Sequence, residues 1–215
     1  RYLTRFYLMI SLGGALGSAL VGIVAPLVLP AYFELAGGLI VTALLLLWQV
    51  RRGHLVFGAL ATAAVLTTAG CAVWGIVEFY KDTIVTARNF YGVLRVQEHG
   101  RDTTSHRRSL VHGTILHGTQ YRDSELSRLP TTYYTSPSGV GRALEMRHPS
   151  TIPIKVGVIG LGTGTLATYG AKGDVYRFYE INPAVLEIAQ RDFTFLRDSD
   201  ATIELALGDA RLSLE

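Results

Sequence analysis

A glycine-rich turn and an acid twenty residues later are the residues whose types and spacing point most directly to chemistry. Gly160, Gly162 and Gly164 follow a short run rich in β-branched residues and lie at the start of a helix predicted at 163–170. Glycines in that place let the backbone turn tightly and approach a ligand closely. Glu180 ends the next predicted strand, where a carboxylate can accept hydrogen bonds from both hydroxyls of a ribose. The pattern predicts a nucleoside site, and the alternative is a turn that is merely tight.

A second acid stands where a third strand ends. Gly208, Asp209 and Ala210 follow the predicted strand at 202–207. The glycine spacing differs from the G-x-G-x-x-G pattern of dinucleotide-binding folds. Together with the segment that begins at Glu180, it resembles the fold that binds S-adenosylmethionine. That resemblance implies that Asp209 lies near the amino group of the adenine.

Longer segments resemble the spermidine synthase family, in the branch whose members carry transmembrane helices before the domain. The matching segments are HGTQ at 117–120, PTTYY at 130–134, SGVG at 138–141, GLGTGT at 160–165, YEINP at 179–183, GDARLSLE at 208–215 and, ahead of the domain, LTRFYLMISLGGALGS at 3–18. The resemblance implies a small β domain on a Rossmann-like domain of the class I methyltransferase type. It also implies an enzyme of polyamine biosynthesis, which transfers an aminopropyl group from decarboxylated S-adenosylmethionine to putrescine.

The resemblance carries roles onto individual positions. Gln120 matches a glutamine that contacts the cofactor, Tyr134 matches a tyrosine that contacts the substrate, and His117 falls at the edge of the pocket. The predicted cofactor-binding residues are Gln120, Gly160, Leu161, Gly162, Gly164, Glu180, Ile181, Asp209 and Ala210. The spacing of the adjacent Tyr133 and Tyr134 alone does not decide which of the two rings faces the cleft.

Two departures from the family weaken the prediction of polyamine recognition. Thr163 stands where soluble members have an aspartate that holds the aminopropyl amine, and Thr135 replaces the residue after the tyrosine. In addition, the family's catalytic aspartate follows a fourth strand, which we expect beyond Glu215. The catalytic base is therefore unknown, and we expect residues 1–215 alone to be inactive and the Rossmann-like fold to be incomplete at its C-terminus. Another chain that supplies the rest of the sheet, or a homo-oligomer, stays open.

Three functions remain open from the residues. The first is aminopropyl transfer to an amine such as putrescine, and the second is an S-adenosylmethionine-dependent methyltransferase with an unknown acceptor. The third is a transport or sensor protein of the membrane in which the nucleoside-binding fold has no catalytic role. Thr163 favours the second over the first, because a threonine cannot carry the negative charge that would hold an amine.

Metal and nucleic-acid binding are not expected. His112 and His117 are five residues apart, and odd spacing on one strand places side chains on opposite faces, so the two should not share a metal ion. The formal charge of +3 comes without a dense basic run, so the sequence does not predict a nucleic-acid partner.

The elements that must position these residues follow a low-charge segment. Residues 1–80 contain four Lys or Arg and two Asp or Glu, whereas residues 81–215 contain sixteen and fifteen. The uncharged stretches at 6–33, 35–50 and 55–77 predict about three transmembrane helices in contact with membrane lipid. Arg51 and Arg52 favour a cytoplasmic loop between the second and third helices, although a nucleoside-binding domain should itself be cytoplasmic. We expect an integral protein, typical of a bacterial inner membrane, whose soluble part is cytoplasmic.

The soluble part should fold in two steps along the chain. Residues 81–150 are rich in β-branched and aromatic runs and predict a small antiparallel β domain with a connecting helix. Residues 151–215 alternate between strand and helix patterns, which predicts a parallel sheet with its strands in spatial order 3-2-1. Asn182 and Pro183 mark the N-terminus of the second helix in this segment.

Overall fold

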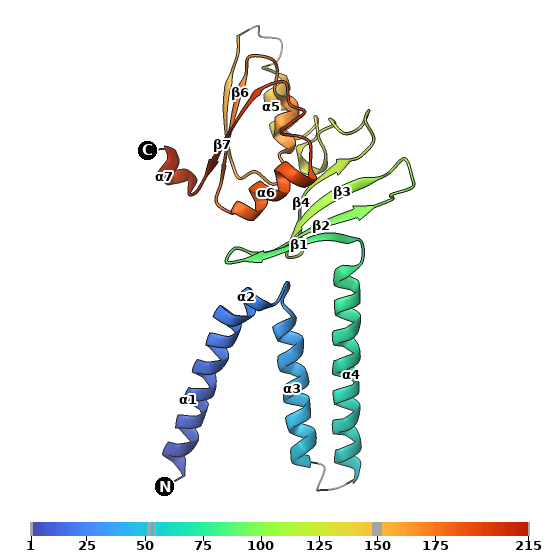
Figure 1. Cartoon of the computed structure of the whole chain (residues 1–215), viewed down its shortest axis with the longest axis vertical. Coiled ribbons are helices and arrows are strands. Elements are labelled where there is room, and N and C mark those ends of the chain that lie inside the picture. The colour runs from blue at the N-terminus through green and yellow to red at the C-terminus, as the bar shows by residue number, and fades with distance from the viewer. Residues whose placement is uncertain (1, 51–52, 54, 148–151, 215) are drawn as a thin grey trace. The chain divides into compact units, whose positions relative to one another are not determined.

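The computed structural model describes residues 2–50, 53, 55–147 and 152–214. The chain forms two compact units, which Figure 1 shows along with the order of the elements. The first unit runs to Lys81 and includes Arg88–Val93, and the second contains Asp82–Ala87 and the chain from Leu94 onward. The prediction of a cytoplasmic loop at Arg51 and Arg52 concerns positions outside the described residues.

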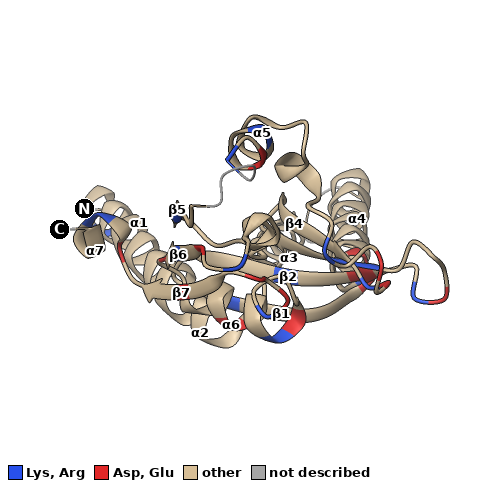
Figure 2. Ribbon diagram, turned by 90° about the horizontal axis from the view of Figure 1, so that it is seen from above, with Lys and Arg blue, Asp and Glu red and all other residues tan. Residues whose placement is uncertain are grey.

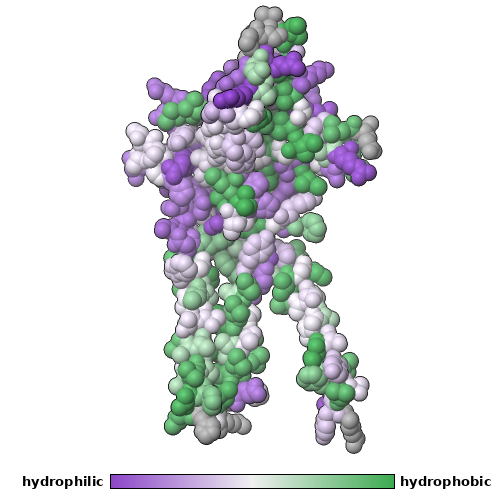
Figure 3. All heavy atoms as spheres, turned by 180° about the vertical axis from the view of Figure 1, so that it is seen from behind, coloured by the Kyte–Doolittle hydropathy of each residue, from purple (hydrophilic) through white to green (hydrophobic). Residues whose placement is uncertain are grey.

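Long apolar helices make up most of the first unit. Helix α1 (Leu3–Ala19) continues through the π-helical turn η1 (Leu20–Val24) into α2 (Ala25–Val28), and α3 (Phe33–Val50) and α4 (Leu55–Tyr80) follow. Within the described residues, three helical segments are long and apolar enough to cross a membrane: Leu3–Val28, Phe33–Val50 and Leu55–Tyr80. Their ribbons carry almost no charged residue in Figure 2, and Figure 3 shows apolar side chains over their surface. The prediction of three spanning helices is confirmed in length and composition.

The π-helical turn has a cause in the sequence. Pro26 has no backbone N–H and cannot donate to the carbonyl four residues earlier. The N–H of Ala25 donates to the carbonyl of Leu20, which is one residue further back than in an α-helix. The helix then ends at Leu29, whose extended backbone conformation precedes Pro30.

An antiparallel sheet follows α4. Its strands are β1 (Thr83–Asn89), β2 (Gly92–His99), β3 (Arg107–His112) and β4 (Ile115–Tyr121), in the order β1-β2-β3-β4. Strands β3 and β4 pair from Arg107 with Tyr121 to His112 with Ile115, and the register shifts between Leu110 and Val111. The antiparallel sheet predicted from the sequence is confirmed.

A parallel sheet forms the C-terminal part of the second unit. Its strands β5 (Lys155–Ile159), β6 (Val175–Glu180) and β7 (Thr202–Leu207) pair in the order β5-β6-β7, as predicted. Along the chain, η2 (Thr132–Tyr134) and α5 (Gly139–Glu145) precede this sheet. The turn η3 (Thr165–Tyr169) and α6 (Pro183–Asp192) connect its strands, and α7 (Ala210–Leu214) follows β7. The helix predicted at 163–170 is present as the short 3-10 turn η3.

One hydrophobic core serves both sheets of the second unit. Tyr176 and Phe178 of β6 are almost fully buried, as are Leu94 and Leu110 of the antiparallel sheet. All four belong to a single cluster of buried side chains that also includes Ile188 of α6. Strand β4 lies against the turn that follows β5, which is where the candidate site lies.

Candidate functional site

The predicted nucleoside-binding residues gather at one edge of the parallel sheet. Strands β5 and β6 pair from Lys155 with Val175 to Ile159 with Tyr179, and β6 pairs with β7 up to Glu180 and Leu207. Because the strands are parallel, the turn at 160–164, the segment at 180–182 and the turn at 208–209 all leave the sheet at its carboxyl edge. Ligands of open α/β sheets bind at this edge.

The glycines are required by the turn itself. The backbone φ angles of Gly160, Gly162 and Gly164 are 89°, 56° and 83°, and residues other than glycine rarely adopt such values. Gly160 N–H donates to the carbonyl of Tyr179 at 2.8 Å, and Gly164 N–H donates to the carbonyl of Leu161 at 2.9 Å. The backbone therefore turns sharply at the end of β5 while its first amide stays bonded to β6.

Glu180 ties the neighbouring segments of this edge together. One carboxylate oxygen accepts a hydrogen bond from Leu161 N–H at 2.9 Å, and the other accepts one from Asn182 N–H at 2.8 Å. A carboxylate has about four lone-pair sites, so each oxygen can accept another hydrogen bond. Glu180 is partly exposed. The carboxylate is thus held in one orientation and can still accept bonds from two hydroxyls.

Strand β4 packs directly against the glycine turn. A methyl group added at Gly118 would collide with the side chain of Thr163, and one added at Gly162 would lie 3.0 Å from the carbonyl oxygen of His117. Thr163 is only 1% exposed, and its hydroxyl lies 2.9 Å from that of Thr165. The side chain of Thr163 therefore faces the protein interior.

His117 lies on β4 beside His112 of β3, and the centroids of the two rings are 5.4 Å apart. Burial lowers the pKa of His117 and the neighbouring His112 lowers it further, whereas the charge of Glu180 raises it. The prediction that the two histidines point to opposite faces is wrong, because the turn at Gly113 places them on adjacent strands. In the part of the chain that the structure describes, no group of three His, Cys, Asp or Glu side chains could hold a metal ion.

Gln120 is buried in contact with the protein itself. Its side-chain N–H groups donate to the carbonyl of Ser127 at 2.9 Å and to the hydroxyl of Thr194 at 2.8 Å. Its side-chain oxygen accepts a bond from Thr194 N–H at 2.9 Å. The amide thereby joins β4 to the segment after α6, and its contact with a cofactor stays a prediction.

The two adjacent tyrosines have different environments. The Tyr133 ring is 54% exposed, whereas Tyr134 is partly buried and packs against the core. Burial, followed by the influence of Tyr133, raises the pKa of Tyr134 to about 12. Its hydroxyl therefore stays protonated at neutral pH, and it can serve as a hydrogen-bond donor to a substrate.

Tyr169 is a residue of this region that the sequence analysis missed. Its hydroxyl donates to the carbonyl of Tyr134 at 2.6 Å and so joins η3 to the segment that carries the tyrosines. The partners are 35 residues apart, so no local pattern could have indicated the contact. A methyl group at Gly141 would lie 2.8 Å from the same hydroxyl, which explains a glycine in the first turn of α5.

The adenine side of the predicted site is open. Asp209 is exposed, and one of its carboxylate oxygens accepts a bond from Arg211 N–H at 2.8 Å. Ile181 is 46% exposed, and Ala210 begins α7. The structure brings Glu180, Ile181, Asp209 and Ala210 to the same carboxyl edge as the glycine turn.

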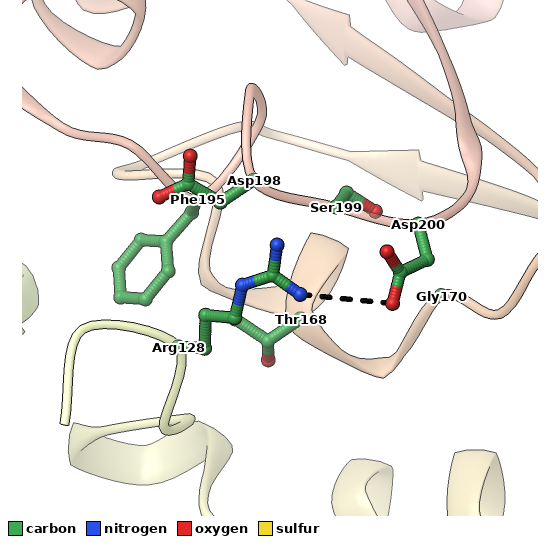
Figure 4. A pocket seen from close by; sticks show the side chains of 7 residues that line it. All are labelled: Arg128, Thr168, Gly170, Phe195, Asp198, Ser199 and Asp200. Atoms are coloured by element: carbon green, nitrogen blue, oxygen red, sulfur yellow. Dashed lines mark ion pairs between the residues drawn. The ribbon is translucent and has the colours of Figure 1, made fainter. Parts of the chain in front are cut away.

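A small pocket elsewhere in the second unit is distinct from this edge. It has a volume of about 30 Å³ and lies between η3 and the segment at 195–200 that precedes β7. Figure 4 shows Arg128 pointing toward Asp200, and their nearest charged atoms are 3.7 Å apart. The space fits about one water molecule and is too small for a nucleoside.

Comparison of the chain with protein-family models, with curated proteins and with solved structures found no match.

Proposed function

We propose that the second unit binds an adenosyl ligand at the carboxyl edge of β5–β7, as a membrane-anchored, spermidine-synthase-like transferase. The observation that carries the proposal is the orientation of Glu180. Its carboxylate is fixed by the amides of Leu161 and Asn182 beside a turn of three glycines with positive φ. A carboxylate held in this way can accept hydrogen bonds from the two hydroxyls of a ribose. Because the glycines have no side chains, the backbone of the turn can approach the rest of the ligand closely.

The ligand would be S-adenosylmethionine or its decarboxylated form. In either case the reacting group is a sulfonium, which is already a good electrophile. The protein then needs mainly to place the acceptor amine in line with the carbon that is transferred and to remove a proton. In the proposal Glu180 holds the ribose, Asp209 accepts a bond from the adenine amino group, and Tyr134 donates a bond to the substrate from the side of η2. The proposal also places His117 at the edge of this pocket and includes a Rossmann-like topology of the methyltransferase type.

Methyl transfer is the second candidate, and the position of Thr163 favours it. An enzyme that grips the amine of decarboxylated S-adenosylmethionine needs a negative charge at the glycine turn. Thr163 is uncharged, and its hydroxyl is buried beside that of Thr165. S-adenosylmethionine has a carboxylate of its own, for which a buried neutral side chain is no obstacle.

Calorimetry on the purified protein tests the proposal. Glu180→Ala should weaken the binding of both adenosyl ligands more than tenfold, because two charge-assisted hydrogen bonds cost about 1.5–3 kcal/mol each when lost. Glu187→Ala is the control, since its side chain on α6 is 70% exposed and pairs only with Arg191 across one helical turn. Unchanged affinity in Glu180→Ala, with the melting temperature preserved, contradicts the proposal. Tighter binding of S-adenosylmethionine than of the decarboxylated form selects methyl transfer.

A further inference from the structure

The turn between β1 and β2 belongs to the first unit, with the apolar helices. Asn89–Gly92 forms its tip, and the Asn89 side-chain oxygen accepts a bond from Tyr91 N–H at 3.0 Å. Phe90 is 95% exposed, and its ring meets the ring of Tyr91 edge-on with centroids 5.5 Å apart. The Phe90 ring thus projects from the hairpin tip almost fully exposed, with the partly exposed Tyr91 ring beside it.

An ion pair holds this hairpin against the start of α3. The Arg88 guanidinium bonds to both carboxylate oxygens of Glu34, at 2.7 and 3.0 Å, and also donates to the carbonyl of Ala31. The two charged side chains are only 6% and 11% exposed, and the guanidinium lies 4.8 Å from the centre of the Tyr32 ring. The bidentate pair fixes the hairpin next to its tip and neutralises both charges.

Between the hairpin tip and the first helical segment lies a groove of about 770 Å³. Its walls include Ile23, Pro26 and Leu27 from the end of that segment and Phe90 from the hairpin. Leu27 is 81% exposed and Ile23 64%, and both belong to a segment long and apolar enough to cross a bilayer. The groove therefore continues the surface that the lipid must cover.

We infer that the tip of the β1–β2 hairpin lies in the bilayer interface and that phospholipid acyl chains near the glycerol backbone fill the groove beneath it. Tyrosine concentrates at this depth because its ring is apolar and its hydroxyl polar, and the wholly apolar Phe90 beside Tyr91 can extend from there toward the acyl chains. The Arg88–Glu34 pair leaves no net charge in the groove, so neutral and zwitterionic lipids fit as well as acidic ones. A protein partner is the competing occupant, and the experiments separate the two.

Tryptophan fluorescence in phosphatidylcholine vesicles tests the depth of the tip. In the full chain, Trp48 and Trp74 are replaced by phenylalanine and Phe90→Trp supplies the only tryptophan. Its emission should be blue-shifted and quenched by lipids brominated near the glycerol backbone. Molecules whose ring at position 90 contacts lipid should outnumber those whose ring contacts water roughly tenfold or more, because burial of an aromatic side chain of this size favours the apolar environment by that factor. The matched control is Thr104→Trp in the polar loop between β2 and β3, which should emit as in water.

Unquenched emission at position 90 overturns the inference, whether it resembles that in water or is blue-shifted by a covering protein.

A second measurement uses the unchanged chain in vesicles that contain a phospholipid with a photoreactive group close to the glycerol. Trypsin cleaves after Arg88 and Arg95, and after Arg101 and Arg107, so the hairpin tip and the polar loop give separate peptides. We expect lipid adducts on 89–95 and none on 102–107, and the absence of adducts on 89–95 also overturns the inference.

Discussion

Glu98 shows how the charge of a single side chain is held within the antiparallel sheet. Its side chain on β2 is 5% exposed, and its carboxylate oxygens lie 2.7 Å from Arg101 Nε, 2.9 Å from Arg108 Nε and 3.1 Å from His106 Nε2. Burial raises the pKa of Glu98, but the bonds from Arg101, Arg108 and His106 together outweigh burial and lower the pKa from 4.5 to about 2.

The depressed pKa predicts a loss of stability in acid. The contribution of the Glu98 carboxylate is complete above pH 4.5 and disappears as the pH falls toward about 2, because only the unfolded chain binds the proton readily in that interval. The loss amounts to at most about 3 kcal/mol. Denaturant unfolding in detergent at several pH values should show a shallower acid decline for Glu98→Gln than for the native chain. Glu187→Gln, which changes an exposed carboxylate, should decline as the native chain does.

At the scale of elements, the contact between β4 and the glycine turn is the one on which the candidate site depends most. Gly118→Ala would push a methyl group into the side chain of Thr163. Overpacking of this kind costs about 1–3 kcal/mol, and the φ of 157° at Gly118 adds backbone strain for a residue with a Cβ atom, so the variant should melt at a lower temperature and bind adenosyl ligands more weakly. In the double variant with Thr163→Ala, the hydroxyl and methyl groups of Thr163 are absent. This variant should recover part of the melting temperature and part of the affinity.

A strand glycine with more room provides the control for this prediction. Gly157 lies on β5, and a methyl group there would come no closer than 3.9 Å to the Tyr179 ring. Gly157→Ala should therefore leave melting and binding nearly unchanged. Equal losses in Gly118→Ala and Gly157→Ala would mean that the close approach of β4 is unimportant for the site.

Elements with a regular pattern could be predicted from the sequence, and contacts between distant segments could not. The strand at 202–207 is present with those bounds, and the Asn182 side chain accepts a bond from Ala184 N–H at 3.1 Å, as expected of a helix N-cap. In contrast, the helix expected at 163–170 is limited to Thr165–Tyr169, because Gly164 adopts a left-handed conformation.

Side-chain partners explain the remaining differences. The two histidines meet because a turn intervenes between them, and spacing along one strand does not describe such a pair. Gln120 bonds to Thr194, which is 74 residues away, so the sequence around Gln120 contains no trace of this contact. Residue types predicted where a ligand could bind. Which of these side chains are accessible depends on the core shared by the two sheets, which the sequence does not show directly.

At the scale of the whole molecule, the first unit exposes apolar side chains on its helices, whereas the second unit buries its apolar side chains in a core. The helical segments bury few of their own side chains, with at most 6% of the most apolar window of each segment buried. The second unit instead buries its apolar residues in one core beneath the carboxyl edge. A nucleoside site on such a protein would act on substrates close to a membrane surface.

The assignment of α4 as a spanning helix predicts a strong effect of one charge at its centre. Leu66 lies near the middle of Leu55–Tyr80 and is 68% exposed, so an arginine there would face lipid. A central arginine costs about 3 kcal/mol on insertion scales, which corresponds to a shift of roughly a hundredfold in the ratio of inserted to non-inserted segment. With residues 50–82 placed in a glycosylation-reporter host protein, Leu66→Arg should lower insertion sharply and Leu66→Ala only slightly. Equal insertion of the arginine and alanine variants would show that α4 packs against protein at this position. A separate experiment sediments membranes that carry residues 1–80. If this segment stays in the soluble fraction, the assignment of spanning helices is contradicted as a whole.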